Sequence, residues 1–431
     1  MLSDSDFRFC LQQIDGRQRT RDKLPTFAAI DGWLYPPRLN LEQCSSERTA
    51  RFKASLLHSL NNIHSSTAQL TNIHSSTAQL TNIHLIDATG GYGVDTFFMS
   101  EQAAQTHYFE QNTNLAAIAE HNFRLAGKHI HCHPEPFTPQ SFESLLAQRS
   151  NSDSGLTAQR SNSVAVLYLD PARRDNHGGK VFRLEDCTPN VIEIIRSVRE
   201  QEDPSNPFNP WAQISLIRIL LKLSPMLDFH QAIAQLGGSW DVYVVSVNGE
   251  VKELLLLSDG SGEIHAVMLT DDGDHDFSYT PQQESGAEAQ FMSTDERLEG
   301  MRVYEPDAAL LKAGAFRLIS ARYGLKKADA NTHLYFSNLQ SPIFNLQSPI
   351  STLSGRWWQI LGVYTRAKEV QRALTRANIL TRNYTLPADA LRKQLRLKDG
   401  GDDYIIGCRL ADRPLLLHCR RIEPVTNCHQ L

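Results

Sequence analysis

The chain has 431 residues, 41% of them hydrophobic and 21% charged, which is typical of soluble globular proteins. Its N-terminus lacks the basic and apolar regions of a signal peptide, and no apolar run is long enough to span a bilayer, so we expect a cytoplasmic protein without membrane association. The seven cysteines are dispersed and none forms a Cys-x-x-Cys pair, which indicates reduced thiols rather than a disulfide framework.

The N-terminal 60 residues are predicted to be helical, because Ala50, Ala54 and Leu57 fall on one helix face. From residue 83 onward, short apolar runs alternate with helix-length segments, which predicts βαβ units and a parallel sheet. The expected strands are Ile83–Ala88, His107–Glu110, Ile130–His133, Val164–Leu169 and Ile214–Leu221.

The pattern changes after these strands. Two apolar runs, Asp241–Val247 and Glu253–Leu257, are separated by a gap too short for a crossover connection, so this pair should be antiparallel. The acidic segment Thr270–Glu299 is predicted to be a linker or an exposed loop. Three pairs of short near-perfect repeats are interpreted as local duplications without function, and they lie at 62–81, 147–163 and 338–350.

Charge is unevenly distributed along the chain. Residues 301–431 contain 20 Lys and Arg against 10 Asp and Glu, although the whole chain has a formal net charge of −5. A basic C-terminal third on an acidic body predicts a surface for a polyanion. Ordinary solvated charge on exposed helices is the alternative interpretation.

A glycine-rich turn follows the first expected strand, in the segment LIDATGGYGVDT at 85–96. The strand ends in Asp87, and Gly91 and Gly93 allow close approach of a ligand to the backbone before a helix begins. A dinucleotide-binding GxGxxG motif would need a glycine where the chain has Thr96, which weakens a nicotinamide interpretation. An acid before the glycines suits a ligand with an ammonium group, such as a methionine moiety. A purely structural turn is the alternative.

Acidic residues also follow the next three expected strands. Glu110 lies 23 residues after Asp87, a spacing at which a carboxylate can accept hydrogen bonds from ribose hydroxyls. Glu135 follows the third strand, where it could face an adenine amino group, and Asp170 ends the fourth. The carboxyl ends of parallel strands meet at one edge of a sheet, so we expect these acids to converge on a ligand.

The segment Asp170-Pro171-Ala172-Arg173-Arg174 lies where catalysis would be placed. The Asp170 carboxylate and the Pro171 carbonyl can accept hydrogen bonds from an attacking amino group in a methyl transfer, and orientation contributes much of the rate in such a displacement. Arg173 and Arg174 could hold a phosphate of the substrate. A strand-ending turn with exposed arginines is the alternative.

Two other groups of residues could carry chemistry. His129, His131 and His133 alternate around Cys132 as on one face of a strand, but no second cluster completes a zinc site, so we expect no structural metal. Cys187 could act as a nucleophile, but without an evident base it is interpreted as structural.

Several motifs together are similar to one known group. They resemble the class I S-adenosylmethionine-dependent methyltransferases of Bacteroidetes that carry a C-terminal THUMP-like domain. The motifs are DATGGYGVDT at 87–96, FEQN at 109–112, LDPARRD at 169–175, GGKVFRLEDCTPN at 178–190, LKLSPMLD at 221–228, VVSVNGEVKELLLL at 244–257, YEPDAALLKAGAF at 304–316, NTHLYFS at 331–337 and LKDGGDDYIIGCRL at 397–410.

The resemblance implies an α/β fold with a Rossmann-like, seven-stranded methyltransferase core and a C-terminal α+β part. It implies an N-terminal helical segment at 1–60, the methyltransferase domain at 61–285, a ferredoxin-like segment at 290–355 and a THUMP-like domain at 356–431.

The resemblance also implies roles for individual residues. With S-adenosylmethionine as the cofactor, Asp87, Gly91 and Gly93 would hold its methionine end, Glu110 its ribose and Glu135 its adenine. Asp170 and Pro171 would face the acceptor; Thr89 and Asp95 are further candidate cofactor contacts. Amino-methylating enzymes usually have a proline and an aromatic residue where this chain has Ala172 and Arg173, so the acceptor atom stays open.

The leading hypothesis is a methyltransferase of structured RNA, tRNA or rRNA, with the basic C-terminal domain presenting the RNA. One alternative is methylation of a small molecule or a protein. Another is a non-catalytic RNA-binding protein with a vestigial cofactor pocket. The sequence predicts no oligomeric state.

Overall fold

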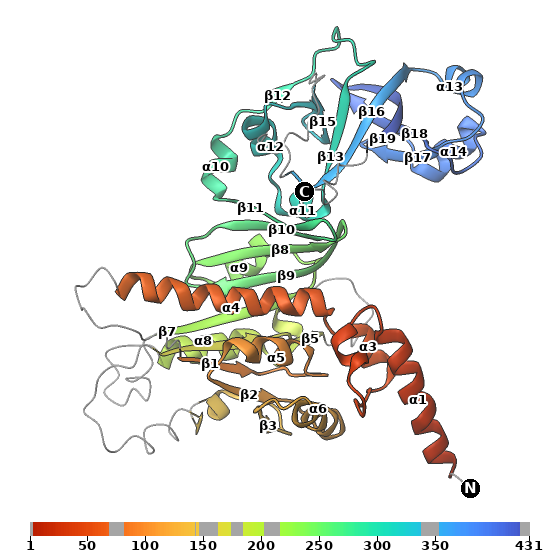
Figure 1. Ribbon diagram of the computed structural model, residues 1–431. Coiled ribbons are helices and arrows are strands. Elements are labelled where there is room, and N and C mark those ends of the chain that lie inside the picture. Colours follow the sequence, from red (N-terminus) through yellow and green to blue (C-terminus); the bar gives the residue numbers. More distant parts are fainter. Residues whose placement is uncertain are drawn as a thin grey trace, which may run out of the picture. The chain divides into compact units, whose positions relative to one another are not determined.

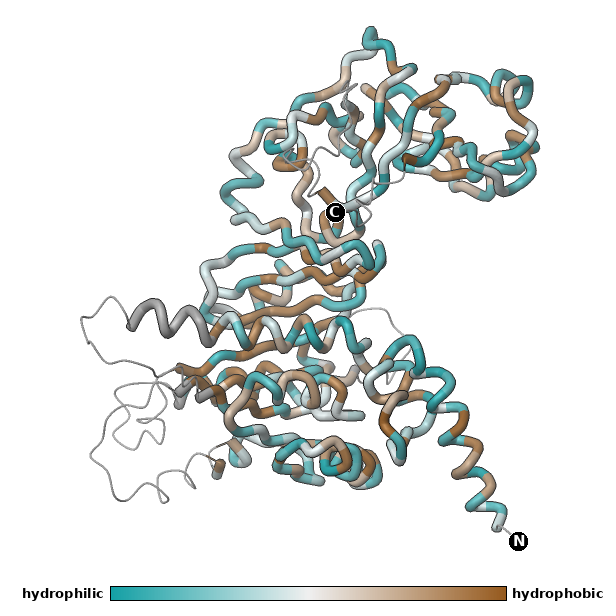
Figure 2. The backbone as a smooth tube through the Cα atoms, in the orientation of Figure 1, coloured by the Kyte–Doolittle hydropathy of each residue, from teal (hydrophilic) through white to brown (hydrophobic). Residues whose placement is uncertain are grey.

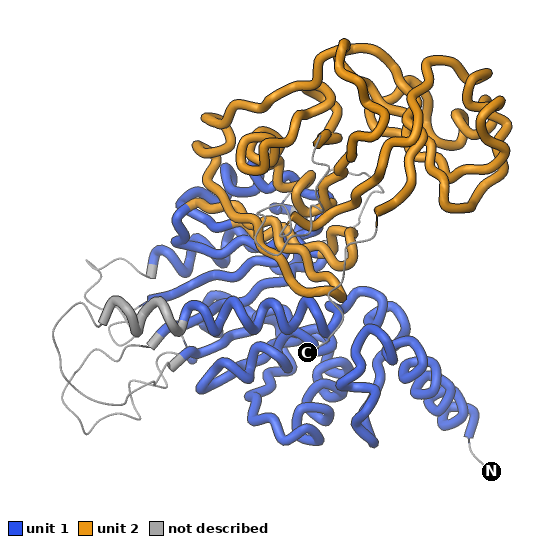
Figure 3. The backbone as a smooth tube through the Cα atoms, turned by 45° about the horizontal axis from the view of Figure 1, so that its top comes forward, with its two compact units in different colours: residues 1–241, 253–261 blue, residues 242–252, 262–431 orange. Residues whose placement is uncertain are grey.

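The computed structural model in Figure 1 describes residues 3–68, 82–142, 144–145, 163–173, 184–201, 216–337 and 353–422. The repeats at 62–81, 147–163 and 338–350 lie largely outside the described residues. Contacts divide the chain into two compact units, residues 1–241 with 253–261 and residues 242–252 with 262–431 (Figure 3). No helix in the described part has the length and apolarity needed to cross a membrane.

The N-terminal part is helical, as predicted. Ser3 caps the first helix, because its hydroxyl accepts from the Asp6 amide while the Asp6 carboxylate accepts from the Ser3 amide. Phe27 anchors this part to the core, since its ring lies 4.2 Å from that of Trp33 and 5.0 Å from that of Phe97. The helices are α1 (Asp4–Thr20), α2 (Pro25–Ala29), α3 (Arg38–Gln43) and α4 (Glu47–Ala68).

Five predicted strands form a parallel block at one end of the larger sheet. β1 lies between β2 and β4, β3 pairs with β2, and β7 pairs with β4, all of them parallel. The strands are β1 (Asn82–Asp87), β2 (Gln105–Phe109), β3 (His131–His133), β4 (Ser163–Leu169) and β7 (Leu216–Leu223). Figure 2 shows the hydrophobic colour along β1, β4 and β7, in keeping with their burial.

Helices lie on both faces of this sheet. Figure 1 places α4, α5 and α6 on one face and α8 and α9 on the other. The connecting helices are α5 (Val94–Met99), α6 (Thr113–Leu125), α8 (Val191–Gln201) and α9 (Phe229–Leu236). Alternation of strands and helices gives the doubly covered α/β layer that the sequence predicts.

The predicted antiparallel pair is present. β8 (Trp240–Val247) and β9 (Glu250–Ser258) are joined by Asn248 and Gly249, whose φ values of 49° and 83° fit a two-residue hairpin turn. The strand order through the larger sheet is β11-β10-β8-β9-β7-β4-β1-β2-β3. Its last seven strands are the predicted methyltransferase sheet, and β9 pairs with β7 in the antiparallel direction.

The prediction that Thr270–Glu299 is a linker or exposed loop was wrong. β10 (Ile264–Thr270) pairs with β11 (Gly273–Tyr279), and α10 (Pro281–Gly286) and β12 (Gln290–Phe291) follow. The acids occupy exposed positions of the turn and of an edge strand, while Phe277 and Tyr279 are buried on its other face. Charges on an edge strand discourage pairing with other chains, and here they masked the strand pattern.

The second unit also contains an eight-stranded sheet in the order β12-β14-β15-β13-β16-β19-β18-β17. Its core is apolar and includes the free thiols Cys408 and Cys419, and burial raises the pKa of Cys408 to about 12. The strands are β13 (Arg302–Pro306), β14 (Lys326–Asp329), β15 (Thr332–Ser337), β16 (Gly355–Tyr364), β17 (Asn378–Arg382), β18 (Asp403–Leu410) and β19 (Arg413–Ile422). The helices are α11 (Ala308–Ala313), α12 (Phe316–Tyr323), α13 (Ala367–Ala373) and α14 (Ala388–Leu395).

Candidate functional site

The glycine-rich turn joins the end of β1 to α5. Gly93 begins the helix at φ 81°, and a Cβ there would lie 2.5 Å from the Phe123 ring. A Cβ on Gly90 would lie 2.0 Å from the Tyr108 ring. Gly91 differs, because a Cβ would meet nothing closer than the Thr89 carbonyl at 3.9 Å, although its φ of 56° favours glycine. Packing therefore requires Gly90 and Gly93, whereas a side chain at Gly91 would be disfavoured only by the backbone conformation.

Asp87 is buried at the end of β1, beneath this turn. Its carboxylate accepts hydrogen bonds from the Thr89 amide at 3.0 Å and from the Thr96 hydroxyl. Burial raises the pKa of Asp87 to about 7, although these two hydrogen bonds oppose the increase. A cationic ligand beside Asp87 would stabilise its ionised carboxylate, because the positive charge of the ligand offsets the cost of burying the negative charge.

Glu110 ties the second strand to the turn. Its carboxylate accepts from the Gly91 amide at 2.9 Å and from the Asn112 amide at 2.7 Å. Glu135 is exposed just after β3, and its amide donates to the His133 carbonyl at 2.8 Å. The structure thus brings Glu110 onto the glycine-rich turn, while Glu135 stands at the same carboxyl edge of the sheet.

Asp170 follows β4 and meets the turn through its backbone, because its amide donates to the Thr89 hydroxyl at 2.6 Å. One oxygen of its carboxylate accepts from the ammonium of Lys222 at 2.7 Å, and 38% of its side chain is exposed. Pro171 comes next and is half-buried. Asp170 and Pro171 therefore stand at the sheet edge that also carries Asp87 and Thr89.

The arginines after Pro171 are described only in part. Ala172 and Arg173 form the short strand β5, which pairs with Cys187 and Thr188 of β6. Arg174 lies outside the described residues, and only the backbone of Arg173 is described. Their expected contact with a substrate phosphate stays a prediction.

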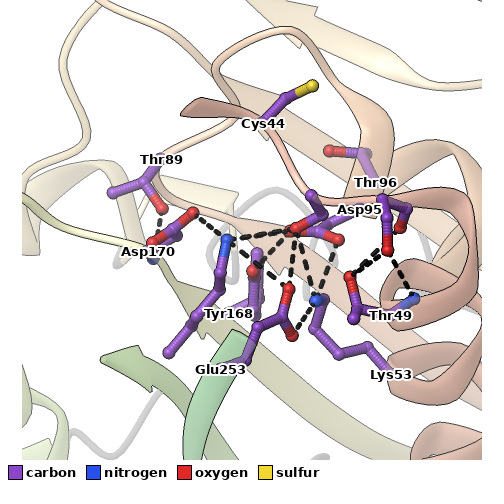
Figure 4. A network of polar contacts seen from close by, with 12 residues as sticks. Cys44, Thr49, Lys53, Thr89, Asp95, Thr96, Tyr168, Asp170 and Glu253 are labelled. Carbon is purple, nitrogen blue, oxygen red and sulfur yellow. Dashed lines mark hydrogen bonds and ion pairs between the residues drawn. The ribbon is translucent and has the colours of Figure 1, made fainter. Parts of the chain in front are cut away.

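Asp95 lies in the first turn of α5 and points into a buried polar network, shown in Figure 4. Its carboxylate accepts from the Ser45 hydroxyl at 2.8 Å and the Tyr168 hydroxyl at 2.7 Å, and it lies 3.2 Å from the ammonium of Lys53. Burial alone would raise the pKa of Asp95, but the lysine charges outweigh it and lower that pKa. Asp95 is thus held inside the network by Ser45, Tyr168 and Lys53. Its predicted cofactor contact stays a prediction.

Two lysines and a glutamate complete the network. Lys53, in α4, is fully buried, and its ammonium donates to Glu253 at 2.5 Å. Lys222, in β7, lies 3.9 Å from Glu253 and 3.8 Å from Asp95 while it binds Asp170. The network therefore connects the N-terminal helices, the sheet and the acid after β4.

The histidines form a stack on β2 and β3. His107 Nδ1 and His133 Nε2 are 3.0 Å apart, and the rings of His107 and His131 stack at 4.9 Å. Burial, followed by the neighbouring histidines, lowers the pKa of His107 to about 3. Within the described ranges no three His, Cys, Asp or Glu side chains are grouped so that they could hold a metal ion.

Comparison with known proteins follows the same division of the chain. Residues 355–421 match the family described as THUMP domain-like, and residues 303–344 match a ferredoxin-like domain family. A crystal structure of a provisionally named methyltransferase from Porphyromonas gingivalis W83 superposes with a TM-score of 0.75 and 26% identity, over 98% of this chain and 92% of that one. This chain has the class I methyltransferase fold. The predicted fold class and the family resemblance are confirmed.

Curated relatives match the methyltransferase part. Two Mycobacterium tuberculosis proteins, from strains CDC 1551 / Oshkosh and ATCC 25618 / H37Rv, are each 27% identical to this chain over 239 residues. Both are named uncharacterized S-adenosylmethionine-dependent methyltransferases. The match covers 54% of this chain and 57% of each relative, so it spans little more than half the length of these proteins.

Sequence reasoning missed three charged members of the network, and it missed the hydroxyls of Ser45 and Tyr168 as well. Lys53 had a signal, since it falls between Ala50 and Leu57 on the apolar face of α4, where a charge must find a buried partner. Lys222 and Glu253 sit inside apolar strands in the same way. Each position indicated a buried charge, but no pattern in the sequence indicated its partner.

Proposed function

We propose that this protein is an S-adenosylmethionine-dependent methyltransferase and that residues at the carboxyl edge of its parallel sheet bind the cofactor. The observation that carries the proposal is the buried Asp87 carboxylate at the end of β1, which accepts a hydrogen bond from the Thr89 amide of the glycine-rich turn. The methyltransferase fold and the names of the relatives support the same reaction.

The residues present suit this cofactor. Asp87 would bind the ammonium of its methionine part, with Thr89 and Gly91 offering backbone groups close by. Glu110 would bind the ribose hydroxyls and Glu135 the adenine amino group. When bound, the cofactor supplies an electrophilic methyl group on a sulfonium, and the protein's contribution is to orient the acceptor toward it.

Asp170 and Pro171 would orient the acceptor. The Asp170 carboxylate is partly exposed, and one of its oxygens binds Lys222, so the other can accept a hydrogen bond from the acceptor. Pro171 adds a carbonyl at the same point of the chain. Arg173 and Arg174 would contact a phosphate near the acceptor.

We further propose that the acceptor is a structured RNA. The module matched at 355–421 contains 14 Lys and Arg against 6 Asp and Glu, and many of the basic side chains are exposed. Such an excess suits a phosphate backbone. Exposed basic residues cluster near the ends of α13 and α14, at Arg372, Arg376, Lys393, Arg396 and Lys398. A small-molecule or protein acceptor is the second candidate.

Cofactor binding should depend on Asp87 and on pH. Because an isosteric amide cannot balance the ligand's ammonium, Asp87→Asn should weaken S-adenosylmethionine binding about 10- to 100-fold at pH 8, as measured by calorimetry. In the wild type the affinity should fall as the pH drops below about 7, because the raised pKa leaves Asp87 protonated there. One proton limits this loss to about tenfold per pH unit.

A matched control is Glu193→Gln, an exposed acid on α8 that should leave both the affinity and its pH dependence unchanged. Equal affinity of Asp87→Asn and the wild type at pH 8 would remove Asp87 from the binding site.

Transfer to RNA tests the whole proposal. Methyl-labelled S-adenosylmethionine and total RNA from a strain that lacks this gene should yield label in a discrete RNA size class. RNA binding should weaken steeply with salt, by about 0.7 to 0.9 log units per tenfold increase for each phosphate neutralised. Cofactor binding without labelled RNA, together with label in protein or small molecules, would replace RNA by the second candidate.

A further inference from the structure

Lys222 is the cation of the buried network that reaches the proposed acceptor site. It projects from β7, only 11% of its side chain is exposed, and it donates to Asp170 at 2.7 Å and to the Ser45 hydroxyl at 3.1 Å. The other lysine of the network, Lys53, binds Glu253 and lies 3.2 Å from Asp95. Lys53 therefore pairs with Glu253 and Asp95, whereas Lys222 pairs with Asp170.

The charges of the network do not cancel. Lys53 and Lys222 face the three carboxylates of Asp95, Glu253 and Asp170, which leaves one negative charge in excess. The side chains of Asp95 and Glu253 are 10% and 4% exposed, whereas that of Asp170 is 38% exposed. A charge is least costly where it can be solvated, so Asp170, the most exposed of the three carboxylates, accommodates the excess negative charge best.

We propose that Lys222 is a positioning residue that fixes one oxygen of the Asp170 carboxylate and leaves the other to accept a hydrogen bond from the methyl acceptor. The proposal rests on the proposed methyltransferase function and deepens it. It selects acceptor atoms that carry a hydrogen, as an amino or hydroxyl group does, because a bare ring nitrogen has no hydrogen to donate to a carboxylate.

Methyl transfer in this arrangement conserves bonds, electrons and protons. A lone pair of the acceptor forms the bond to the methyl carbon as the carbon–sulfur bond breaks, and the sulfur keeps that bonding pair as a neutral thioether. The acceptor's surplus proton then leaves to water. Lys222 stays protonated throughout, because its carboxylate neighbours, Asp170 first, outweigh the effect of burial and raise its pKa.

Burial raises the pKa of Asp170, and Lys222 opposes that increase through both its charge and its hydrogen bond. Without Lys222 the carboxyl group would hold its proton to higher pH, and the oxygen of a neutral carboxyl group accepts the acceptor's hydrogen more weakly than a carboxylate oxygen does. Among the residues that the structure describes, the groups that act on Asp170 are Lys222 of β7, Asp95 of α5, Glu253 of β9, Asp87 of β1 and Tyr168 of β4.

The test compares Lys222→Met with Lys222→Arg in the full chain. An infrared pH titration follows the protonated carboxyl band of Asp170, which is assigned by its absence in Asp170→Asn. We expect Lys222→Met to move the midpoint upward by about 1 to 3 pH units and Lys222→Arg to move it far less. Single-turnover transfer at saturating cofactor and RNA should show the same upward shift of its pH profile, with unchanged cofactor affinity.

Identical midpoints in the wild type and Lys222→Met would overturn the positioning role, as would an unshifted pH profile with only a lower melting temperature. If Lys222→Met does not fold, Lys222→Met/Glu253→Gln restores the net charge of the network and carries the same titration. A different result is that the wild type transfers no methyl group while Lys222→Met still moves the Asp170 midpoint upward as expected. That result would instead overturn the proposed function, and with it the role of Lys222 in the reaction.

Discussion

Replacing Asp170 by Ala is expected to slow methyl transfer by about 100- to 10,000-fold, the range typical for loss of one hydrogen-bonding group that acts in the transition state. The side chain of Asp170 contacts Lys222 rather than the glycine-rich turn, and only its backbone amide meets Thr89. Cofactor affinity should therefore stay within about twofold of the wild type, since Asp87 and Gly91 are untouched. Single-turnover kinetics and calorimetry on the same preparation separate the two effects.

Asp170→Asn sharpens this result, because the amide keeps one acceptor oxygen and loses the charge. It should be impaired less than Asp170→Ala if orientation of the acceptor dominates. Asp272→Ala, an exposed acid in the β10–β11 turn, is the matched control and should transfer at the wild-type rate. Full turnover by Asp170→Ala would contradict our assignment and direct attention to Glu110 or Pro171.

Local patterns in the sequence predicted most of the sheet and the glycine-rich turn. The strands before Asp87 and Asp170 are short apolar runs that end in an acid, and each run can be predicted from its local sequence alone. The turn at Gly91 and Gly93 can be predicted in the same way, because a left-handed backbone conformation before a helix favours glycine. Where the pattern was weaker, at β11, exposed acids on an edge strand made a paired segment look like a loop.

The buried network could not be predicted, because its contacts join residues far apart in the chain. Lys53 and Glu253 are separated by 200 positions, and Lys222 and Asp170 by 52. The sequence indicates that Lys53 is buried, but only the packing of α4 against α5 and the sheet shows which carboxylates receive its charge. The role of Asp95 was obscured for the same reason.

The largest effect on stability is expected for Lys53→Met. This change removes the cation that serves Glu253 and Asp95, whose carboxylates are almost fully enclosed. Breaking a buried pair on one side leaves an uncompensated charge and costs about 3–5 kcal/mol. The free energy of unfolding, measured by urea denaturation and followed by circular dichroism, should fall by that amount, while the methionine fills much of the volume of the lysine stem.

Lys252→Met is the matched control, one residue before Glu253 in the chain. Lys252 pairs with Glu250 at 2.7 Å, but both side chains are largely exposed, at 43% and 74%. Such surface pairs contribute about 0–1 kcal/mol, so this variant should unfold almost as the wild type does. If Lys53→Met lost no more stability than Lys252→Met, Glu253 and Asp95 would have to be neutral in the folded protein. Lys222 would then carry the only charge facing Asp170, and the excess negative charge that we assign to Asp170 would not exist.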